Sequence, residues 1–229
     1  MNKDNFKKEI LNHFKCDETL FDKIELYKEI LIENNKKYNL TRLEEESKIY
    51  LNYFFESIIV YKDILKNEKC RLLDIGSGSG IPGVLIKLFY PNIDVTIIES
   101  NNKKCDFMDL LIDKLELDGI SVICKRAEIL ESDERETFDF VTSRAVASLK
   151  ALIEISTPYL KINGLLIEPK SNNLDNELLE SKDIIRRLKI SCQDTLNYTF
   201  FDRVHNVAIL KKTEVTSMEF PRMWKDIVK

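Results

Sequence analysis

A glycine-rich run at positions 74–83, Asp-Ile-Gly-Ser-Gly-Ser-Gly-Ile-Pro-Gly, holds the residues best suited to binding chemistry in this chain. Residues 71–73 before it predict a buried strand, and residues 84–89 after it predict a helix. A glycine turn between a strand and a helix is how α/β proteins bind nucleotides, because glycine adopts positive φ and lets a ligand approach the backbone. The helix beginning adds unpaired N–H groups and a positive dipole end. The run therefore predicts a pocket for a small cofactor.

Two cofactor classes fit this pocket. Residues 78–83 match G-x-G-x-x-G, and Glu99 lies nineteen residues after Gly80, where an acid would meet ribose hydroxyls. Both NAD and S-adenosylmethionine (SAM) fit this pattern, and a turn that binds nothing is the third interpretation. Three features favour SAM: Asp74 completes the form D-x-G-x-G-x-G, about 70 helical residues precede the first predicted strand, and a hairpin is predicted at the C-terminus.

Each polar group of the run has an expected role toward SAM. We expect the backbone amides around Gly76, Gly78 and Gly80 to lie against the methionine part of the cofactor. The Asp74 carboxylate is predicted to bind the cofactor's amino group, directly or through water. Glu99 is predicted to accept both ribose hydroxyls, because an ionised carboxylate only accepts hydrogen bonds and has room for two donors.

The segment Arg126-Ala127-Glu128 follows the third predicted strand, where the adenine of such a cofactor would rest. The amide of Ala127 and the carboxylate of Glu128 are predicted to read the adenine edge. The alternative for Glu128 is a solvated acid at a helix start, where it would complement the helix dipole.

The first 69 residues are predicted to be helical, because they contain no glycine or proline and their apolar residues recur at helical spacing. Thr41 and Glu44 have the spacing of a capping box, which predicts a helix from about residue 43 to residue 66. We expect residues 1–69 to form a helical segment packed on a core domain of residues 70–229.

Predicted strands and helices alternate from residue 70 onward. We expect strands at 70–75, 94–99, 120–124, 138–142, 164–168, 195–201 and 205–211. We expect helices at 84–89, from 101 or 102 to about 117, at 148–159 and at 175–188. The last two strands are joined by only Asp202-Arg203-Val204, which suits an antiparallel hairpin. The pattern predicts a Rossmann-like α/β fold of the class I SAM-dependent methyltransferase type, with a seven-stranded, mostly parallel sheet that ends in an antiparallel hairpin.

Composition excludes several classes of protein. The 229 residues are 44% hydrophobic and 32% charged, as in globular proteins, and no apolar run is long enough to span a bilayer. With no signal-peptide pattern at the N-terminus, we expect a cytoplasmic protein without membrane contact. Two histidines and five cysteines without a C-x-x-C pair offer little material for a metal site, and we expect none. The net charge of −4 is unlike that of a bulk nucleic-acid binder, so any RNA contact must be local.

Six short motifs are spread over most of the chain. They are the glycine run, Glu99-Ser100 with Lys103-Lys104 and Phe107, Arg126-Ala127-Glu128, Ser143-Arg144-Ala145-Val146-Ala147, Tyr38-Asn39-Leu40-Thr41 and Phe220-Pro221-Arg222. Together they resemble the RsmG family, also called glucose-inhibited division protein B. The resemblance implies a bacterial SAM-dependent enzyme that methylates N7 of one guanosine in small-subunit (16S) ribosomal RNA. It also implies cofactor contacts at Gly76, Ile81, Ala127, Glu128 and Arg144.

The chain departs from this family at two places. Pro169-Lys170-Ser171 stands where the family usually has Lys-Gly after the fifth strand. Residues 223–229 replace the family's usual tail, which is rich in glycine, proline and lysine. Both departures concern the expected RNA contacts rather than the fold.

Methylation at guanine N7 needs no general base, because N7 has a lone pair and carries no proton. The chemistry then depends on proximity, alignment and electrostatics, which agrees with a chain that lacks a histidine or paired-carboxylate cluster. Arg144 follows the fourth predicted strand and is the predicted catalytic residue, since a guanidinium there can bind the cofactor carboxylate, guanine O6 or a phosphate. The alternative is a surface arginine paired with an acid.

The expected partner is 16S ribosomal RNA or a small-subunit precursor particle, bound by a monomer of this chain. Residues predicted to contact the RNA are Lys170, Arg203, Arg222 and Lys225. Three alternatives stay open: a SAM enzyme with another substrate, an NAD-dependent oxidoreductase, and a binding module without activity.

Overall fold

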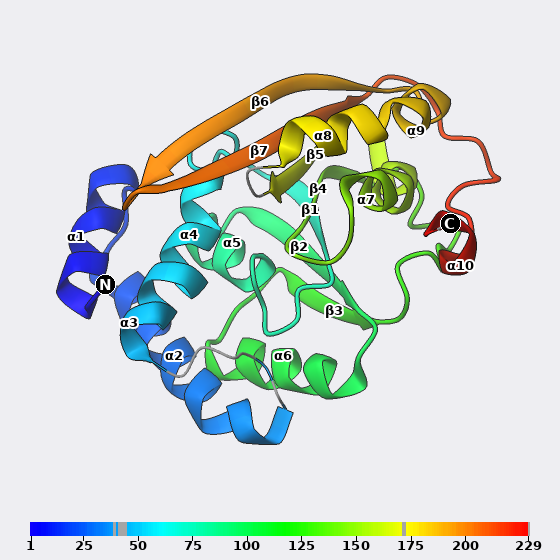
Figure 1. Ribbon diagram of the computed structural model, residues 1–229. Coiled ribbons are helices and arrows are strands. Elements are labelled where there is room, and N and C mark those ends of the chain that lie inside the picture. Colours follow the sequence, from blue (N-terminus) through cyan, green and yellow to red (C-terminus); the bar gives the residue numbers. More distant parts are fainter. Residues whose placement is uncertain (39, 41–44, 171–172, 229) are drawn as a thin grey trace. The chain divides into compact units, whose positions relative to one another are not determined.

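The computed structural model describes residues 1–38, 40, 45–170 and 173–228 (Figure 1). The chain divides into two compact units. Unit 1 comprises residues 1–69 and 77–124, and unit 2 comprises residues 70–76 and 125–229. The predicted capping box at Thr41 and Glu44 lies outside the described residues, as does the end of the motif that begins at Tyr38.

Unit 1 combines the N-terminal helices with two strands and two helices of the glycine-loop region. Its helices are α1 (Lys3–His13), α2 (Glu18–Tyr38), α3 (Glu46–Lys48), η1 (Ile49–Phe55), α4 (Glu56–Ile58), η2 (Ile59–Tyr61), α5 (Gly83–Phe89) and α6 (Asn102–Lys114). Its strands are β2 (Ile93–Glu99) and β3 (Ile120–Cys124), which pair in parallel. The side chain of Asn101 caps α6 by accepting from the amides of Lys103 and Lys104.

The single helix predicted from about residue 43 to 66 is instead a chain of short pieces, α3 to η2, with a π-helical turn in η1. The reason is the aromatic run in this segment. Tyr50, Tyr53, Phe54 and Phe55 are all buried, and a regular 3.6-residue period would turn one of them toward solvent. The wider π turn lets all four face the core, where Phe6 of α1 contacts Tyr50 and Phe54.

Unit 2 contains the remaining strands of the sheet. Its strands are β1 (Cys70–Ile75), β4 (Phe138–Ser143), β5 (Leu160–Lys170), β6 (Ile190–Phe200) and β7 (Arg203–Lys212). Its helices are α7 (Leu149–Ser156), η3 (Thr157–Tyr159), α8 (Leu174–Glu180), α9 (Lys182–Arg187) and α10 (Trp224–Ile227). Strands β1, β4 and β5 are parallel, whereas β7 is antiparallel to both β5 and β6. The long β6–β7 ribbon is the orange hairpin of Figure 1.

The strands of the described residues form one seven-stranded sheet in the order β3-β2-β1-β4-β5-β7-β6. This confirms the predicted fold, a mostly parallel sheet that ends in an antiparallel hairpin. Several element boundaries differ from the prediction. The hairpin turn is Phe201-Asp202, with φ of 48° and 59°, because the cross-strand pairs continue to Phe200 and Arg203. The helix predicted at 175–188 is divided into α8 and α9 at Ser181, whose hydroxyl donates to the Glu177 carbonyl at 2.6 Å.

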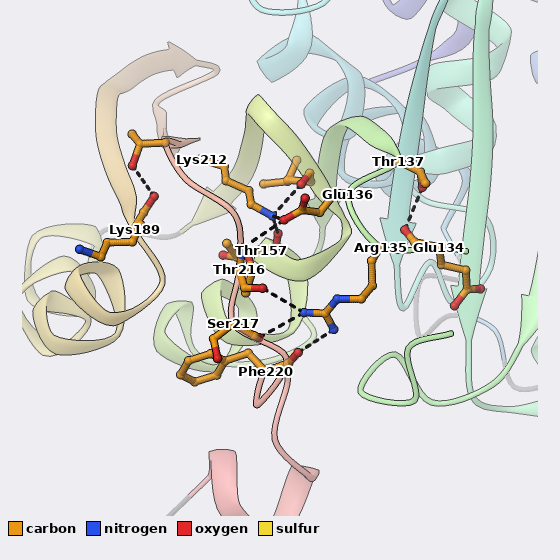
Figure 2. A network of polar contacts seen from close by, with 12 residues as sticks. Glu134, Arg135, Glu136, Thr137, Thr157, Lys189, Lys212, Thr216, Ser217 and Phe220 are labelled. Atoms are coloured by element: carbon orange, nitrogen blue, oxygen red, sulfur yellow. Dashed lines mark hydrogen bonds and ion pairs between the residues drawn. The ribbon is translucent and has the colours of Figure 1, made fainter. Parts of the chain in front are cut away.

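A polar network in unit 2 fixes the segment that follows β7 (Figure 2). Lys212 is fully buried, and its Nζ donates to Glu136 Oε1 and to the Leu160 carbonyl, both at 2.8 Å. Burial lowers the pKa of Lys212, while Glu136 acts in the opposite direction. Arg135 donates to the Phe220 carbonyl at 2.9 Å, and Glu136 accepts from the Thr216 amide at 3.0 Å. The chain after β7 is therefore tied to the loop before β4.

Candidate functional site

The glycine loop connects β1 to α5, as predicted from its position between a strand and a helix. Gly76, Gly78 and Gly80 have φ of 73°, 64° and 96°, which confirms that these positions require the left-handed region. A Cβ on Gly78 would lie 3.9 Å from Lys104 Nζ and would otherwise meet open space. The backbone at Gly78 is therefore accessible to a ligand.

Within unit 1, the structure brings Glu99 to the glycine loop. The Gly78 amide donates to Glu99 Oε2 at 3.1 Å, and the Asn101 amide donates to Glu99 Oε1 at 2.9 Å. Glu99 ends β2 and is buried. The two amides hold the carboxylate in one orientation, and its oxygens keep further lone pairs that can accept hydroxyl groups. Ile81 is also buried here, and its amide donates to the Ser77 carbonyl at 3.0 Å.

Two tyrosines that the sequence did not single out hold the same loop. The Tyr27 hydroxyl of α2 donates to the Ser79 carbonyl at 2.5 Å, and the Tyr53 hydroxyl of η1 donates to it at 3.2 Å and also contacts Ser79 Oγ. Both rings are buried. Their helical spacing indicates core residues, and no local signal distinguishes a tyrosine whose hydroxyl reaches a loop 26 or 52 positions away.

In unit 2, the carboxyl ends of the strands place three polar side chains together. Asp74, near the end of β1, is fully buried. Ser143 Oγ, at the end of β4, donates to the buried Glu168 of β5 at 2.9 and 3.1 Å. Burial raises the pKa of Glu168 to about 8, against the opposing effects of Lys170 and of the Ser143 hydrogen bond. Sequence reasoning missed Glu168, because a single glutamate inside an apolar strand has no motif around it.

Arg144 begins the segment that follows β4, as predicted, and is half-buried. The next residue, Ala145, has a φ of 56°, and Val146 then reaches toward Gly76. A Cβ on Gly76 would lie 2.7 Å from a Val146 methyl carbon. Glycine at position 76 is therefore required both for its backbone angle and for the close approach of the segment that carries Arg144.

The predicted adenine-reading segment is a turn, not a helix start. Arg126 Nε donates to Glu128 Oε1 at 2.9 Å, and the Glu128 side chain is only 6% exposed. The alternative of a solvated acid at a helix start is therefore wrong. The Tyr159 hydroxyl donates to the Ala127 carbonyl at 2.8 Å, and burial raises the pKa of Tyr159. The turn is held from both sides, because Glu128 accepts from Arg126 and the Ala127 carbonyl accepts from Tyr159.

The four residues predicted to contact RNA occupy different environments. Lys170 Nζ donates to the Ala147 carbonyl at 3.0 Å and lies 3.2 Å from Glu177. Arg222 binds Glu154. Their cations are thus engaged within unit 2, and each has a structural role. Arg203 at the hairpin turn and Lys225 in α10 are exposed.

The described residues also bear on metal and membrane contacts. None of their helices is long and apolar enough to cross a membrane. No group of three or more histidine, cysteine, aspartate or glutamate side chains among them could hold a metal ion.

Comparison with known proteins places the sequence in one family. Residues 20–203 match the family described as "rRNA small subunit methyltransferase G" (GidB). Three relatives are named "Ribosomal RNA small subunit methyltransferase G". The one from Malacoplasma penetrans is 44% identical over 90% of this chain and 88% of the relative. The one from Ureaplasma parvum is 41% identical over 93% and 92%, and the one from Streptococcus pneumoniae is 38% identical over 88% and 86%.

Solved structures show the same fold at low sequence identity. M. jannaschii TYW2 in complex with AdoMet aligns with a TM-score of 0.55 and 16% identity, over 69% of this chain and 77% of that chain. MtNAS in complex with MTA and tNA aligns with a TM-score of 0.54 and 18% identity, over 83% and 74%. The sheet order and these likenesses are those of the class I SAM methyltransferase fold. By its sequence over most of its length, the chain belongs to the rRNA small subunit methyltransferase G family.

Proposed function

We propose that this protein transfers the methyl group of SAM to N7 of a guanosine in 16S ribosomal RNA. One observation in this family member carries the proposal. The Gly78 amide donates a hydrogen bond to the Glu99 carboxylate, and the backbone at Gly78 is open to a ligand. This pairing provides a fixed acceptor for ribose hydroxyls next to a backbone that a ligand can approach.

The residues proposed to hold SAM have distinct tasks. They are Asp74, Gly76, Gly78, Gly80, Ile81, Glu99, Ala127, Glu128 and Arg144. Glu99 would orient the ribose, and Ala127 with Glu128 would read the adenine edge. Asp74 would bind the amino group of the methionine part, which carries a positive charge.

When bound, SAM supplies a methyl group on a positively charged sulfur, and attack by the guanine N7 lone pair forms the N–C bond as the S–C bond breaks. No proton leaves the base, so the chain needs no general base. Its residues act by fixing the two reactants in line and by electrostatics. Arg144 would bind the cofactor carboxylate or guanine O6, since a guanidinium donates two parallel hydrogen bonds.

Transfer of a labelled methyl group to 16S rRNA tests the proposal, with free RNA and small-subunit particles compared as substrates. We expect 7-methylguanosine in the digested product. Calorimetric titration with S-adenosylhomocysteine (SAH), and with NADH as the competing cofactor class, tests the site. Binding of NADH without binding of SAH would overturn the assignment in favour of an oxidoreductase.

Arg144→Ala tests the proposed catalytic residue. We expect methyl transfer to fall at least about tenfold, which corresponds to about 1.4 kcal/mol, without loss of the fold. Arg186→Ala is the matched control, because Arg186 is an exposed arginine whose partner Asp183 is on the same helix. Wild-type turnover in Arg144→Ala would show that another group performs this task.

We further propose a cytoplasmic monomer in which residues 1–69 are a helical segment packed on a domain of residues 70–229. The hydrogen bonds from Tyr27 and Tyr53 to Ser79 support this, since helices of the first segment hold a loop of the second. The mass in solution from light scattering tests the monomer. Expression of residues 70–229 alone tests whether the domain needs the helical segment. We expect this shortened protein not to bind SAH. Among the proposed RNA contacts, we expect exposed Arg203 and Lys225 to affect RNA affinity and its salt dependence.

A further inference from the structure

The C-terminal segment of the described residues is firmly built into unit 2. Arg135 donates to the Ser217 carbonyl at 3.2 Å as well as to that of Phe220, as Figure 2 shows. Further along, Arg222 Nε and Nη2 donate to the two carboxylate oxygens of Glu154, each at 2.6 Å. These contacts fix the chain on the approach to α10, so the side chains of that helix have defined neighbours.

The first residue of α10, Trp224, lies against the predicted adenine-reading turn. The carbon at the centre of the Arg126 guanidinium is 5.3 Å from the centre of the Trp224 ring, which is a cation–π contact. The same guanidinium donates through Nε to Glu128 Oε1 at 2.9 Å. A planar guanidinium can stack on a ring with its face while its edge donates hydrogen bonds, and a lysine cannot do both.

This arrangement makes a relay of three side chains, from Trp224 through Arg126 to Glu128. The Arg126 side chain is 47% exposed, and its contacts with the Trp224 ring and with Glu128 confine its long and flexible stem. The Glu128 side chain is only 6% exposed, and one of its oxygens accepts from Arg126. The orientation of the Glu128 carboxylate decides where its second oxygen points.

We propose that Trp224 is a positioning residue for the cofactor site: it holds Arg126, which orients Glu128 toward the exocyclic amino group of the adenine. The inference rests on the proposed function, because it presumes that the 126–128 turn receives the adenine of SAM. It adds that the C-terminal segment of the described residues contributes to cofactor recognition. The effect concerns affinity for the adenine end and leaves the methyl-transfer step unchanged.

A ligand pair that differs only at the adenine edge tests the relay. SAH carries the amino group that a carboxylate can accept, whereas S-inosylhomocysteine carries a carbonyl oxygen there. We expect the wild-type protein to prefer SAH by calorimetric titration. Trp224→Ala should weaken SAH binding about threefold to tenfold and reduce the preference by a similar factor, with kcat at saturating SAM unchanged. Trp224→Phe, which keeps an aromatic face, should recover most of the preference.

Two further variants separate positioning from general stability. Met223→Ala is the matched control, since Met223 is the neighbouring residue and is 57% exposed, and it should bind both ligands as the wild type does. Glu128→Gln should abolish the preference, and adding Trp224→Ala to it should then have no additional effect on SAH affinity.

The outcomes distinguish this inference from the proposed function. If the wild type binds SAH tightly but Trp224→Ala keeps the full preference, or weakens both ligands equally, only the relay is overturned. A separate effect of Trp224→Ala in the Glu128→Gln background would also overturn it. Should the wild-type protein fail to bind SAH at all, the proposed function and the relay would fall together. Trp224 is the only tryptophan of the chain, so a change of its fluorescence on SAH addition gives an independent readout in the wild type.

Discussion

Replacing Glu168 by glutamine is expected to make the protein markedly more resistant to alkaline pH. The carboxyl group is buried, and both of its oxygens lie within hydrogen-bond distance of Ser143 Oγ. Burial raises its pKa from 4.5 to about 8, so the group is mainly protonated in the native protein at neutral pH. Glutamine has the same shape, carries no charge, and keeps an oxygen that accepts from Ser143.

The sign of the pH effect follows from the proton balance between the two states. Between pH 4.5 and about 8 the native state keeps the Glu168 proton while the unfolded chain has lost it, so the free energy of unfolding falls as pH rises. Above about pH 8 the carboxyl group is ionised in the native protein too, so the free energy of unfolding falls no further. A difference of one pKa unit is worth about 1.4 kcal/mol, so the whole effect is at most about 5 kcal/mol.

Urea unfolding, followed by circular dichroism at pH 5, 6, 7, 8 and 9, measures this effect. The wild type and Glu168→Gln should have similar free energies of unfolding at pH 5. The variant should become more stable than the wild type as pH rises, by about 3–5 kcal/mol at pH 9. Glu219→Gln, at an exposed position, is the control and should follow the wild type. Parallel curves for wild type and Glu168→Gln across the whole range would refute the claim that the native carboxyl is protonated.

Three other substitutions test the contacts that shape the site. Gly80→Ala should destabilise the protein by about 3 kcal/mol in urea unfolding, because its φ is 96° and the new Cβ would lie 2.7 Å from the Tyr27 hydroxyl; a wild-type unfolding curve would contradict this. Tyr27→Phe removes the 2.5 Å hydrogen bond to the Ser79 carbonyl and should lower the free energy of unfolding by about 1 kcal/mol and weaken SAH binding. Unchanged SAH affinity would separate the loop contact from cofactor binding. Arg222→Ala leaves the Glu154 carboxylate, which is 1% exposed, without its cation. We expect the free energy of unfolding to fall by about 3 kcal/mol, near the lower limit for buried pairs, because Arg222 itself is 35% exposed. Weaker RNA binding with unchanged stability in Arg222→Ala would instead favour a direct RNA contact.

Residue types and their spacing along the chain were enough to predict the fold class and the location of the loop. Alternating strands and helices, followed by two strands with a short link, specify a mostly parallel sheet with an antiparallel end, since short links cannot join parallel strands. The glycines at 76, 78 and 80 mark positive φ directly, because few other residues adopt it at low cost. These features are local, and local features can be read from residue types and spacing.

The side chains that support that loop and its surroundings could be identified only once the chain was seen folded. Tyr27, Glu168 and Trp224 each act on residues more than 20 positions away, through a hydroxyl, a buried carboxyl and an aromatic face. In the sequence each belongs to an ordinary apolar or amphipathic pattern. Arg222 likewise forms an ion pair with Glu154 in the folded protein, although an arginine at this position had been predicted to contact RNA. Such roles depend on which elements the fold brings into contact, and periodicity along the chain contains no information about partners distant in sequence.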